Sequence, residues 1–437
     1  MSFKKIVFLF VAGLLVFTSC SDDDNAVAPT TDVNLQLRLP PSLTGIESLM
    51  YKCGTATLTN LNTGVISTHH LAGLATTIST VEDGAYSVLV EADMIYPTIV
   101  KTPGKKVNAE GDVELVVEIA SHTIEVKIKG FTENVEIKGG ELNEELALFE
   151  VKENTGFVIS EIYYTGSLTP ESKNYRQDTF FEIYNNSNET LYADGLAIGE
   201  GAFNAGFARL NSNLTPDNRA THTAIQAFYR VPGNGMTYPV EPGESITLCD
   251  IGIDHRAHNP QSIDLSQADF EWYDDSPIPS VQDVDIESVT NLEKVYCYTR
   301  TIWQPNMQGN HAYVLFKLDK TKEAFLEENL QEYDYLFEFN GFSRDITKKY
   351  YTIPNEAVLD AVELSNPTAF YWKIVAPELD LGWTNSGYTE SDKNGRGRSV
   401  VRKVSHVEED GRVVLLDTNN STIDFQVAES PNPGVVN

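Results

Sequence analysis

Short runs in which apolar and polar residues alternate, separated by turn signals, recur through this chain of 437 residues. In the first run, Val33, Leu35 and Leu37 share one side while polar residues occupy the other, which is typical of a half-buried strand. Asn62-Thr63-Gly64 and Glu82-Asp83-Gly84 supply the residue types that tight turns need. Further runs cover residues 56–61, 85–90, 113–119 and 124–128. The pattern predicts a mainly β fold built from sandwiches.

Charge and composition limit the class of protein. Acidic residues outnumber basic ones 63 to 32, which gives a formal net charge of −31. A surface of this sign repels phosphate backbones and argues against nucleic-acid binding. Hydrophobic residues make up 41% of the chain, with 29 glycines besides, and this is an ordinary globular composition. Wholesale disorder, a collagen helix and a coiled-coil rod are therefore excluded.

The N-terminal segment, residues 1–19, has the features of a targeting signal. Lys4 and Lys5 precede an apolar stretch of 12 residues, Ile6–Phe17, which is shorter than the roughly 20 residues of a spanning helix. The following Phe17-Thr18-Ser19-Cys20 resembles a bacterial lipobox. This resemblance implies that Cys20 becomes the first mature residue and carries the acyl chains that anchor the protein. A chance cysteine after an ordinary secretory signal is the alternative.

An acidic tether, residues 20–32, follows. Its Ser21-Asp22-Asp23-Asp24-Asn25 run resembles the export signal that sends lipoproteins of Bacteroidota-type bacteria to the outer face of the outer membrane. The resemblance implies a protein that is lipid-anchored in the outer membrane and exposed at the cell surface. A flexible spacer that holds the protein on the periplasmic side is the alternative.

Two β-rich domains are expected after the tether, over residues 33–150 and 151–437. In the first, Asp83-Gly84-Ala85-Tyr86-Ser87-Val88 resembles an element of carboxypeptidase-regulatory or transthyretin-like sandwiches. In proteins of that kind the module is a spacer, and the resemblance implies the same role here.

The second domain carries motifs at both of its ends. It opens with Phe157–Tyr164 and Phe180–Asn185, and it closes with Gly397–Lys403, Asp417–Phe425 and Pro431–Gly434. These strings resemble the lamin-tail domain, an immunoglobulin-like sandwich. The whole chain resembles an uncharacterised family of Bacteroides-type surface lipoproteins built in this way.

Insertions and a single helix are expected inside the second domain. Since such domains need only about 100–150 residues, large insertions should fill roughly residues 200–350. Variable loops on a rigid sandwich are where binding residues usually lie. The helix is expected over Lys320–Tyr335, where four apolar residues have helical spacing: Phe325, Leu326, Leu330 and Tyr333.

Aromatic residues of the insertions form the candidate ligand-binding site. Trp272 and Tyr273 precede two aspartates, and Trp303 precedes Gln304-Pro305-Asn306. Exposed aromatic rings beside carboxylates and amides can grip sugar rings by stacking and hydrogen bonding. We therefore expect these three residues to bind a small ligand on exposed loops. The alternative is that the rings cover the sandwich core, since tryptophan is highly buried on average.

Signatures of catalysis and cofactor binding are missing from the sequence. It holds no nucleophile elbow, zinc-protease motif, Walker loop or dinucleotide fingerprint. His255 and His258 could bind a metal from one helix face, but the neighbouring Arg256 and Pro260 favour solvated loop histidines. Asp417–Asp424 superficially resembles a calcium loop but lacks the glycine and the distal glutamate, so a turn closed by hydrogen bonds is expected. No enzyme activity, metal or cofactor is predicted.

Two smaller groups of residues also carry predictions. At most one disulfide can form among three cysteines, and a Cys249–Cys297 bond and buried free thiols both stay open. These cysteines are Cys53, Cys249 and Cys297. A solvated strand face is expected where basic residues gather in the acidic chain, with an acidic partner or lipid headgroups as the alternative. These basic residues are Arg396, Arg398, Arg402 and Lys403.

Together these features predict a non-catalytic outer-membrane lipoprotein that captures a small ligand at the cell surface. It would pass the ligand to an energised TonB-dependent β-barrel transporter. A structural or adhesive surface protein is the first alternative, favoured if Trp272 and Trp303 are buried. A lipid-tethered hydrolase is the second, and it requires two converging carboxylates in a pocket or a metal at His255 and His258.

Overall fold

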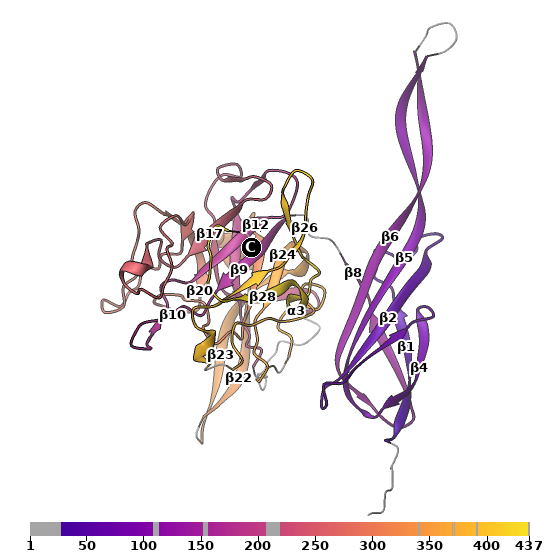
Figure 1. Ribbon diagram of the computed structural model, residues 1–437, viewed down its shortest axis with the longest axis horizontal. Helices are drawn as coiled ribbons and strands as arrows, with labels where there is room; N and C mark the ends of the chain where they lie inside the picture. Colours follow the sequence, from indigo (N-terminus) through magenta and orange to yellow (C-terminus); the bar gives the residue numbers. More distant parts are fainter. Residues whose placement is uncertain are drawn as a thin grey trace, which may run out of the picture.

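The computed structural model describes residues 28–107, 113–151, 156–206, 219–339, 341–368, 370, 372–389 and 392–435. The signal peptide, Cys20 and most of the acidic tether lie outside the described residues. Strands predominate and form several sheets (Figure 1), so the mainly β, sandwich-rich fold is confirmed. Within the described ranges, none of the helices is long and apolar enough to span a bilayer.

The N-terminal body is a sandwich of two sheets. One has the order β4-β1-β7, in which β1 pairs antiparallel with β4 and parallel with β7. The other, β3-β2-β5-β6-β8, is antiparallel. Val33, Leu35 and Leu37 of β1 lie in the shared core, as their alternation predicts. The strands are β1 Thr30–Arg38, β2 Met50–Asn60, β3 Ile66–His70, β4 Ala75–Glu82, β5 Gly84–Val107, β6 Val113–Ile137, β7 Glu141–Ala147 and β8 Phe149–Glu150.

The hairpin of β5 and β6 is much longer than this sandwich. Its register runs from Gly84 opposite Ile137 to Val107 opposite Val113. Figure 1 shows the far half of the hairpin continuing as a two-stranded ribbon beyond the other strands. The runs expected at 113–119 and 124–128 belong to one strand, because residues 120–123 stay paired with residues 97–100.

Residues from 157 onward form the C-terminal body. Its strands are β9 Phe157–Tyr163, β10 Ser167–Leu168, β11 Asn174–Tyr175, β12 Phe180–Asn185, β13 Leu191–Tyr192, β14 Leu196–Gly201, β15 His222–Arg230, β16 Pro239–Val240, β17 Ser245–Cys249, β18 Phe270–Glu271, β19 Thr290–Asn291, β20 Glu293–Cys297, β21 Ala312–Lys317, β22 Leu330–Phe339, β23 Phe342–Pro354, β24 Val358–Glu363, β25 Ser399–Arg402, β26 Val404–Val407, β27 Val413–Leu415 and β28 Phe425–Ala428. Its helices are α2 Lys322–Glu328 and α3 Ser421–Asp424, with 3-10 turns η1 His255–Ala257, η2 Asn355–Ala357 and η3 Lys393–Gly395.

Two large sheets enclose the main core of this body. One has the order β19-β18-β17-β12-β9-β25-β28, and the other β22-β23-β15-β14-β21-β24, with β20 also paired to β15. In β14, Ile198 joins the core between the sheets, whereas Ala197 joins a second cluster on the outer face, together with Phe325 of α2. The central strands β14 and β21 of the second sheet are therefore buried on both faces, which explains the continuous apolar run of β21.

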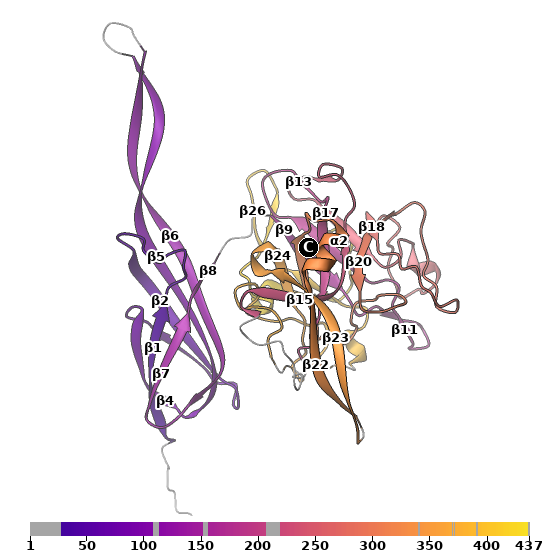
Figure 2. The ribbon, with the colours of Figure 1, turned by 180° about the vertical axis from the view of Figure 1, so that it is seen from behind.

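The helix expected over Lys320–Tyr335 ends early. α2 stops at Glu328, and the chain continues as β22, which pairs antiparallel with β23. The two strands form a hairpin that protrudes from the body in both views (Figures 1 and 2). The prediction is wrong for residues 330–335 because Tyr333 also fits a two-residue alternation. Its ring packs against Phe203 and Tyr350 as a strand residue.

Candidate functional site

The two predicted tryptophans lie in the core of the C-terminal body. Trp272 and Trp303 are both 0% exposed. The Trp303 ring stacks on Tyr229 and Phe181 at centroid distances of 5.1 and 6.3 Å, and the Trp272 ring meets it edge-on at 5.0 Å. The expectation of exposed indoles is therefore wrong. Their loops fold inward because each indole buries a large apolar area between the sheets.

The aspartates beside these rings hold the loops in place. Tyr273 is half-buried, and Asp274 is fully buried next to it. The Asp274 carboxylate accepts hydrogen bonds from the Trp303 amide at 2.6 Å and from the Tyr229 hydroxyl at 2.9 Å. Lys294 Nζ lies 2.5 Å from Asp274 Oδ1. With its oxygens engaged in this way, Asp274 organises the core and presents no free carboxylate beside Trp272.

His255 is a buried structural histidine. Its Nε2 donates to the Ile251 carbonyl at 2.8 Å, which leaves Nδ1 to accept from the Tyr175 hydroxyl at 2.7 Å. Burial lowers the pKa of His255, in keeping with a neutral ring. His258 is exposed, as expected, whereas the prediction of solvent exposure is wrong for His255. Both nitrogens of His255 are occupied, so it does not point to a metal site.

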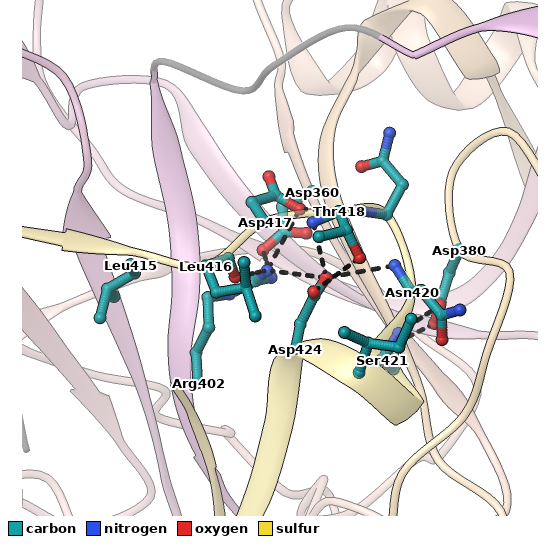
Figure 3. Close-up of polar contacts among 12 residues, drawn as sticks. Asp360, Asp380, Arg402, Leu415, Leu416, Asp417, Thr418, Asn420, Ser421 and Asp424 are labelled. Atoms are coloured by element: carbon teal, nitrogen blue, oxygen red, sulfur yellow. Dashed lines mark hydrogen bonds and ion pairs between the residues drawn. The ribbon is translucent and has the colours of Figure 1, made fainter. Parts of the chain in front are cut away.

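Arg402 forms a buried polar cluster where the two large sheets meet (Figure 3). Its side chain is 1% exposed, and its Nη2 lies 2.5 Å from Asp360 Oδ2 on β24. Its Nε donates to the Ile159 carbonyl of β9 at 2.9 Å, and the Ile159 amide donates to Asp360 at 2.7 Å. One guanidinium thus joins strands of both sheets. The predicted solvated strand face is wrong for Arg402.

The same guanidinium holds the loop of the closing motif. Arg402 Nη1 donates to the Leu416 carbonyl at 3.1 Å and to Asp417 Oδ1 at 3.2 Å, and it lies 3.6 Å from Asp424 Oδ2. The Asp424 carboxylate accepts from the Thr418 amide at 2.9 Å and the Thr418 hydroxyl at 2.8 Å. These contacts are those of a turn closed by hydrogen bonds, as expected, and they occupy oxygens that a calcium ion would require.

Burial governs the electrostatics of this cluster. It raises the pKa of Asp360 to about 7, although the Arg402 guanidinium acts in the opposite direction. Burial also raises the pKa of Asp424. Removing one partner from a buried ion pair typically costs about 3–5 kcal/mol, because an uncompensated charge stays behind. The cluster therefore serves to fix the closing loop onto the sandwich.

The opening and closing motifs meet at two buried glutamates. Glu161 of β9 and Glu182 of β12 lie directly opposite each other in the strand register. Ser399 donates its hydroxyl to Glu161, and Thr247 donates its hydroxyl to Glu182 at 2.7 Å. The amide of Asn432 in the closing motif donates to Glu161 at 3.4 Å. Burial raises the pKa of Glu161 to about 7. These carboxylates converge, but hydroxyls and the C-terminal segment engage their oxygens.

A shallow groove of about 520 Å³ lies on the N-terminal body, a place where the sequence predicted only a spacer. On the outward side of β1, the Asn34 side chain bonds to both neighbouring strands. Thr77 of β4 donates to Asn34 Oδ1 at 2.7 Å, and Asn34 Nδ2 donates to Asn143 Oδ1 of β7 at 3.0 Å. The alternation of β1 marked these positions only as solvent-facing. The lining residues are Asn34, Leu35, Gln36, Ala75, Thr76, Thr77, Asn143, Glu144 and Glu145.

The cysteine predictions have separate outcomes. Cys53, Cys249 and Cys297 are free thiols, with Cys53 exposed and Cys249 buried. The alternative of free thiols is therefore confirmed, and the Cys249–Cys297 disulfide is not formed. Cys20, the predicted lipid anchor, lies outside the described residues, so its role stays a prediction.

Comparisons with known proteins identify a region of unknown function. Residues 241–432 match a family model described as "Protein of unknown function (DUF4876)". Among solved structures, the chain is similar to a DUF4876 family protein from Bacteroides thetaiotaomicron VPI-5482, with 22% sequence identity and a TM-score of 0.49. That alignment covers 93% of this chain and 96% of the other. No curated protein matches the chain.

Proposed function

We propose that this chain is a non-catalytic, lipid-anchored protein of the cell surface with a structural or adhesive role. It contacts macromolecular partners over its β-rich exterior. The burial of Trp272 and Trp303 carries this proposal, since both rings are 0% exposed and pack in the core of the C-terminal body. Aromatic residues that fill a core are unavailable for stacking on a sugar.

The buried acids also support a role without catalysis. Catalytic carboxylates need an open cleft that a substrate can enter. Here the Glu161–Glu182 pair accepts bonds from hydroxyls and from the C-terminal segment, while Asp360 binds Arg402. Each of these acids stabilises the sandwich through its own partners. A tethered hydrolase requires an acid that has a raised pKa and also faces the substrate. None of these three positions offers such an acid.

The location and the finer fold types belong to the same proposal. The lipobox at Cys20 and the acidic run after it support an outer-membrane anchor and surface display. The opening and closing motifs support a lamin-tail-like architecture for the C-terminal body. They meet in the structure, where Asn432 donates to Glu161. The turn at Asp83-Gly84 between β4 and β5 supports a transthyretin-like N-terminal body.

Two experiments test this proposal, the first of them on intact cells. The first labels the wild type and a Cys20→Ser variant with a palmitate analogue, and then adds protease to the cells. We expect label and protease sensitivity in the wild type, and loss of the label in Cys20→Ser. An unlabelled wild type, or one that added protease fails to trim, would contradict the anchor.

The second experiment identifies the partner by affinity purification from solubilised outer membranes. We expect surface macromolecules to copurify, and we expect a deletion strain to lose adhesion to them. Stoichiometric copurification of a β-barrel transporter, together with adhesion that survives the deletion, would contradict the adhesive role. That result would support ligand transfer instead.

Ligand capture for a TonB-dependent transporter is the second candidate, and the groove on β4-β1-β7 favours it. Its volume of about 520 Å³ falls in the range of small-molecule sites, and amide, hydroxyl and carboxylate side chains stand in its lining. Such groups suit a polyhydroxylated ligand. Replacing Asn34 and Asn143 by leucine should then abolish ligand uptake while the protein stays folded. Unchanged uptake of every nutrient tested in a deletion strain would remove this candidate.

A further inference from the structure

Two arginines donate hydrogen bonds to the same loop of the C-terminal body. Arg176 follows β11, and its Nη2 donates to the Pro305 carbonyl at 3.0 Å. Arg396 follows η3, and its Nη1 donates to the Met307 carbonyl at 2.8 Å. Both side chains are half-buried. Burial lowers the pKa of Arg396, and the positive charge of Arg176 adds to that effect. Two like charges are thus held close together in an otherwise acidic protein.

A small cavity lies beside Arg396, with a free volume of about 10 Å³. That is room for about one occupant of the size of a water molecule. Two of its lining residues carry buried nitrogen atoms that have no hydrogen-bond partner among the described residues, namely Nε of Arg396 and Nδ2 of Asn366. An unsatisfied buried donor typically costs about 1–3 kcal/mol, and more when it is charged. Both donors therefore favour an acceptor in this cavity.

We propose that this cavity binds a small monovalent anion of the size of chloride. The Nε–H of Arg396 and the amide of Asn366 would donate to the ion, and the paired charges of Arg176 and Arg396 would hold it electrostatically. Asp392 also lines the cavity, but its carboxylate accepts the amides of Tyr388 at 3.0 Å and Asn394 at 2.9 Å. Those bonds lower the pKa of Asp392, so its carboxylate is ionised and repels an anion, a repulsion that the two donated amides offset in part.

Water is the competing occupant of this cavity. The hydrogen-bond donors that line the cavity favour an anion over water. A water molecule accepts two hydrogen bonds but must also donate two, whereas an anion only accepts. The unpartnered groups at this cavity are both donors, and one of them is a cation. An anion beside Arg396 also offsets the unfavourable effect of the Arg176 charge on Arg396, and it does so more strongly than a neutral water.

Bromide provides a direct test, because it has the charge of chloride and a measurable anomalous signal. Crystals of the wild-type protein are soaked in sodium bromide, and data are collected at the bromine edge. We expect an anomalous peak within hydrogen-bonding distance of Arg396 Nε and Asn366 Nδ2. A cavity that holds ordinary water density without an anomalous peak would overturn the proposal.

Thermal unfolding in solution provides an independent test. Sodium chloride is exchanged for sodium gluconate at constant ionic strength, so that only the small anion changes. We expect chloride to raise the melting temperature by about 2–4 °C in a saturable way, as a ligand of the native state does. Equal melting temperatures in the two salts would count against the site.

Variants locate the effect at this cavity. Asn366→Asp places a carboxylate next to Arg396, and it should remove the chloride dependence because the protein then supplies its own anion. Arg396→Met should also remove it. Arg398→Met is the matched control, since Arg398 pairs with Glu429 at 2.7 Å on the surface and should keep the chloride response. A chloride response that persists in Asn366→Asp would overturn the proposal, even if Arg396→Met fails to fold.

Discussion

The single guanidinium of Arg402 forms ion pairs with the carboxylates of Asp360, Asp417 and Asp424. In the variant Arg402→Met those acids lose their buried counter-charge, and the hydrogen bond to the Ile159 carbonyl is lost as well. We expect the free energy of unfolding of the C-terminal body to fall by about 3–5 kcal/mol, measured by urea denaturation at neutral pH.

The control for this change is Arg398→Met, a surface arginine of the same basic segment. Its partner Glu429 has a side chain that is 76% exposed, and pairs of this kind contribute about 0–1 kcal/mol. Arg402→Lys should fall between the two variants, because lysine keeps the charge but cannot donate to Ile159 and Asp360 in one plane. Equal stability losses for Arg398→Met and Arg402→Met would contradict a special role of the cluster.

The raised pKa of Glu161 predicts how the free energy of unfolding depends on pH. The folded protein holds this proton up to about pH 7, whereas an unfolded glutamate releases it near its ordinary pKa of about 4.3. Between those values the folded state binds more protons, so stability falls as pH rises and is level above about 7. Glu161→Gln should remove a decrease of about 2.5 kcal/mol from the curve of unfolding free energy between pH 5 and 7.5.

Other buried acids contribute to the same pH range, so the comparison between variants matters more than the slope itself. Burial raises the pKa of Glu363 to about 7, and that of Asp360 likewise. The Glu161→Gln variant should therefore retain part of the pH dependence. Glu356→Gln, a change at an exposed glutamate, is the control and should leave the wild-type curve in place. If the curve of Glu161→Gln ran parallel to the wild type, the buried-proton account would be wrong.

Single-residue environments were the hardest feature to predict from sequence. Trp303 stands in a polar stretch, yet the fold brings Phe181 and Tyr229 to its ring from distant strands. Arg402 sits among basic neighbours, but its acidic partner Asp360 lies 42 residues away along the chain. Such partners are defined by strand pairing and sheet packing, and local composition carries no signal for them.

At the scale of single elements, α2 depends on its first turn. Thr321 caps the helix, and its hydroxyl accepts the amide of Ala324 at 3.3 Å. Thr321→Ala should lower the free energy of unfolding by about 1 kcal/mol, because a helix of this length has few hydrogen bonds to replace the cap. Urea denaturation checks this value. Thr321→Ser keeps a hydroxyl and should stay near the wild type, so a loss as large as that of Thr321→Ala would contradict capping.

Element type was predictable wherever the alternation was clear. β1, β9 and β12 lie where their patterns place them, because one face or both faces of each strand are buried. The stretch after Glu328 was misassigned since Leu330 and Tyr333 satisfy a helical spacing, whereas Tyr333, Tyr335 and Phe337 recur at every second residue, as in a strand. What resolves this ambiguity is β23, whose backbone pairs with β22 along the whole hairpin.

At the scale of the whole molecule, the chain builds separate hydrophobic cores. Residues between 33 and 148 share one apolar cluster, while residues from 157 onward supply the clusters of the C-terminal body. The predicted division near residue 150 stays a prediction, and it can be tested directly. Each body encloses a core of its own, so each should unfold as an independent cooperative unit.

Thermal unfolding of the full chain should therefore show two transitions, followed by circular dichroism and by calorimetry. Fragments 28–151 and 156–435, produced separately, should fold and should each reproduce one of them. Tryptophan fluorescence assigns the transitions, because all four tryptophans, Trp272, Trp303, Trp372 and Trp383, lie in the second fragment. Arg402→Met should shift only the transition that fluorescence reports, since its partners all lie in the C-terminal body. A single transition that every variant shifts would mean that the two bodies fold as one unit.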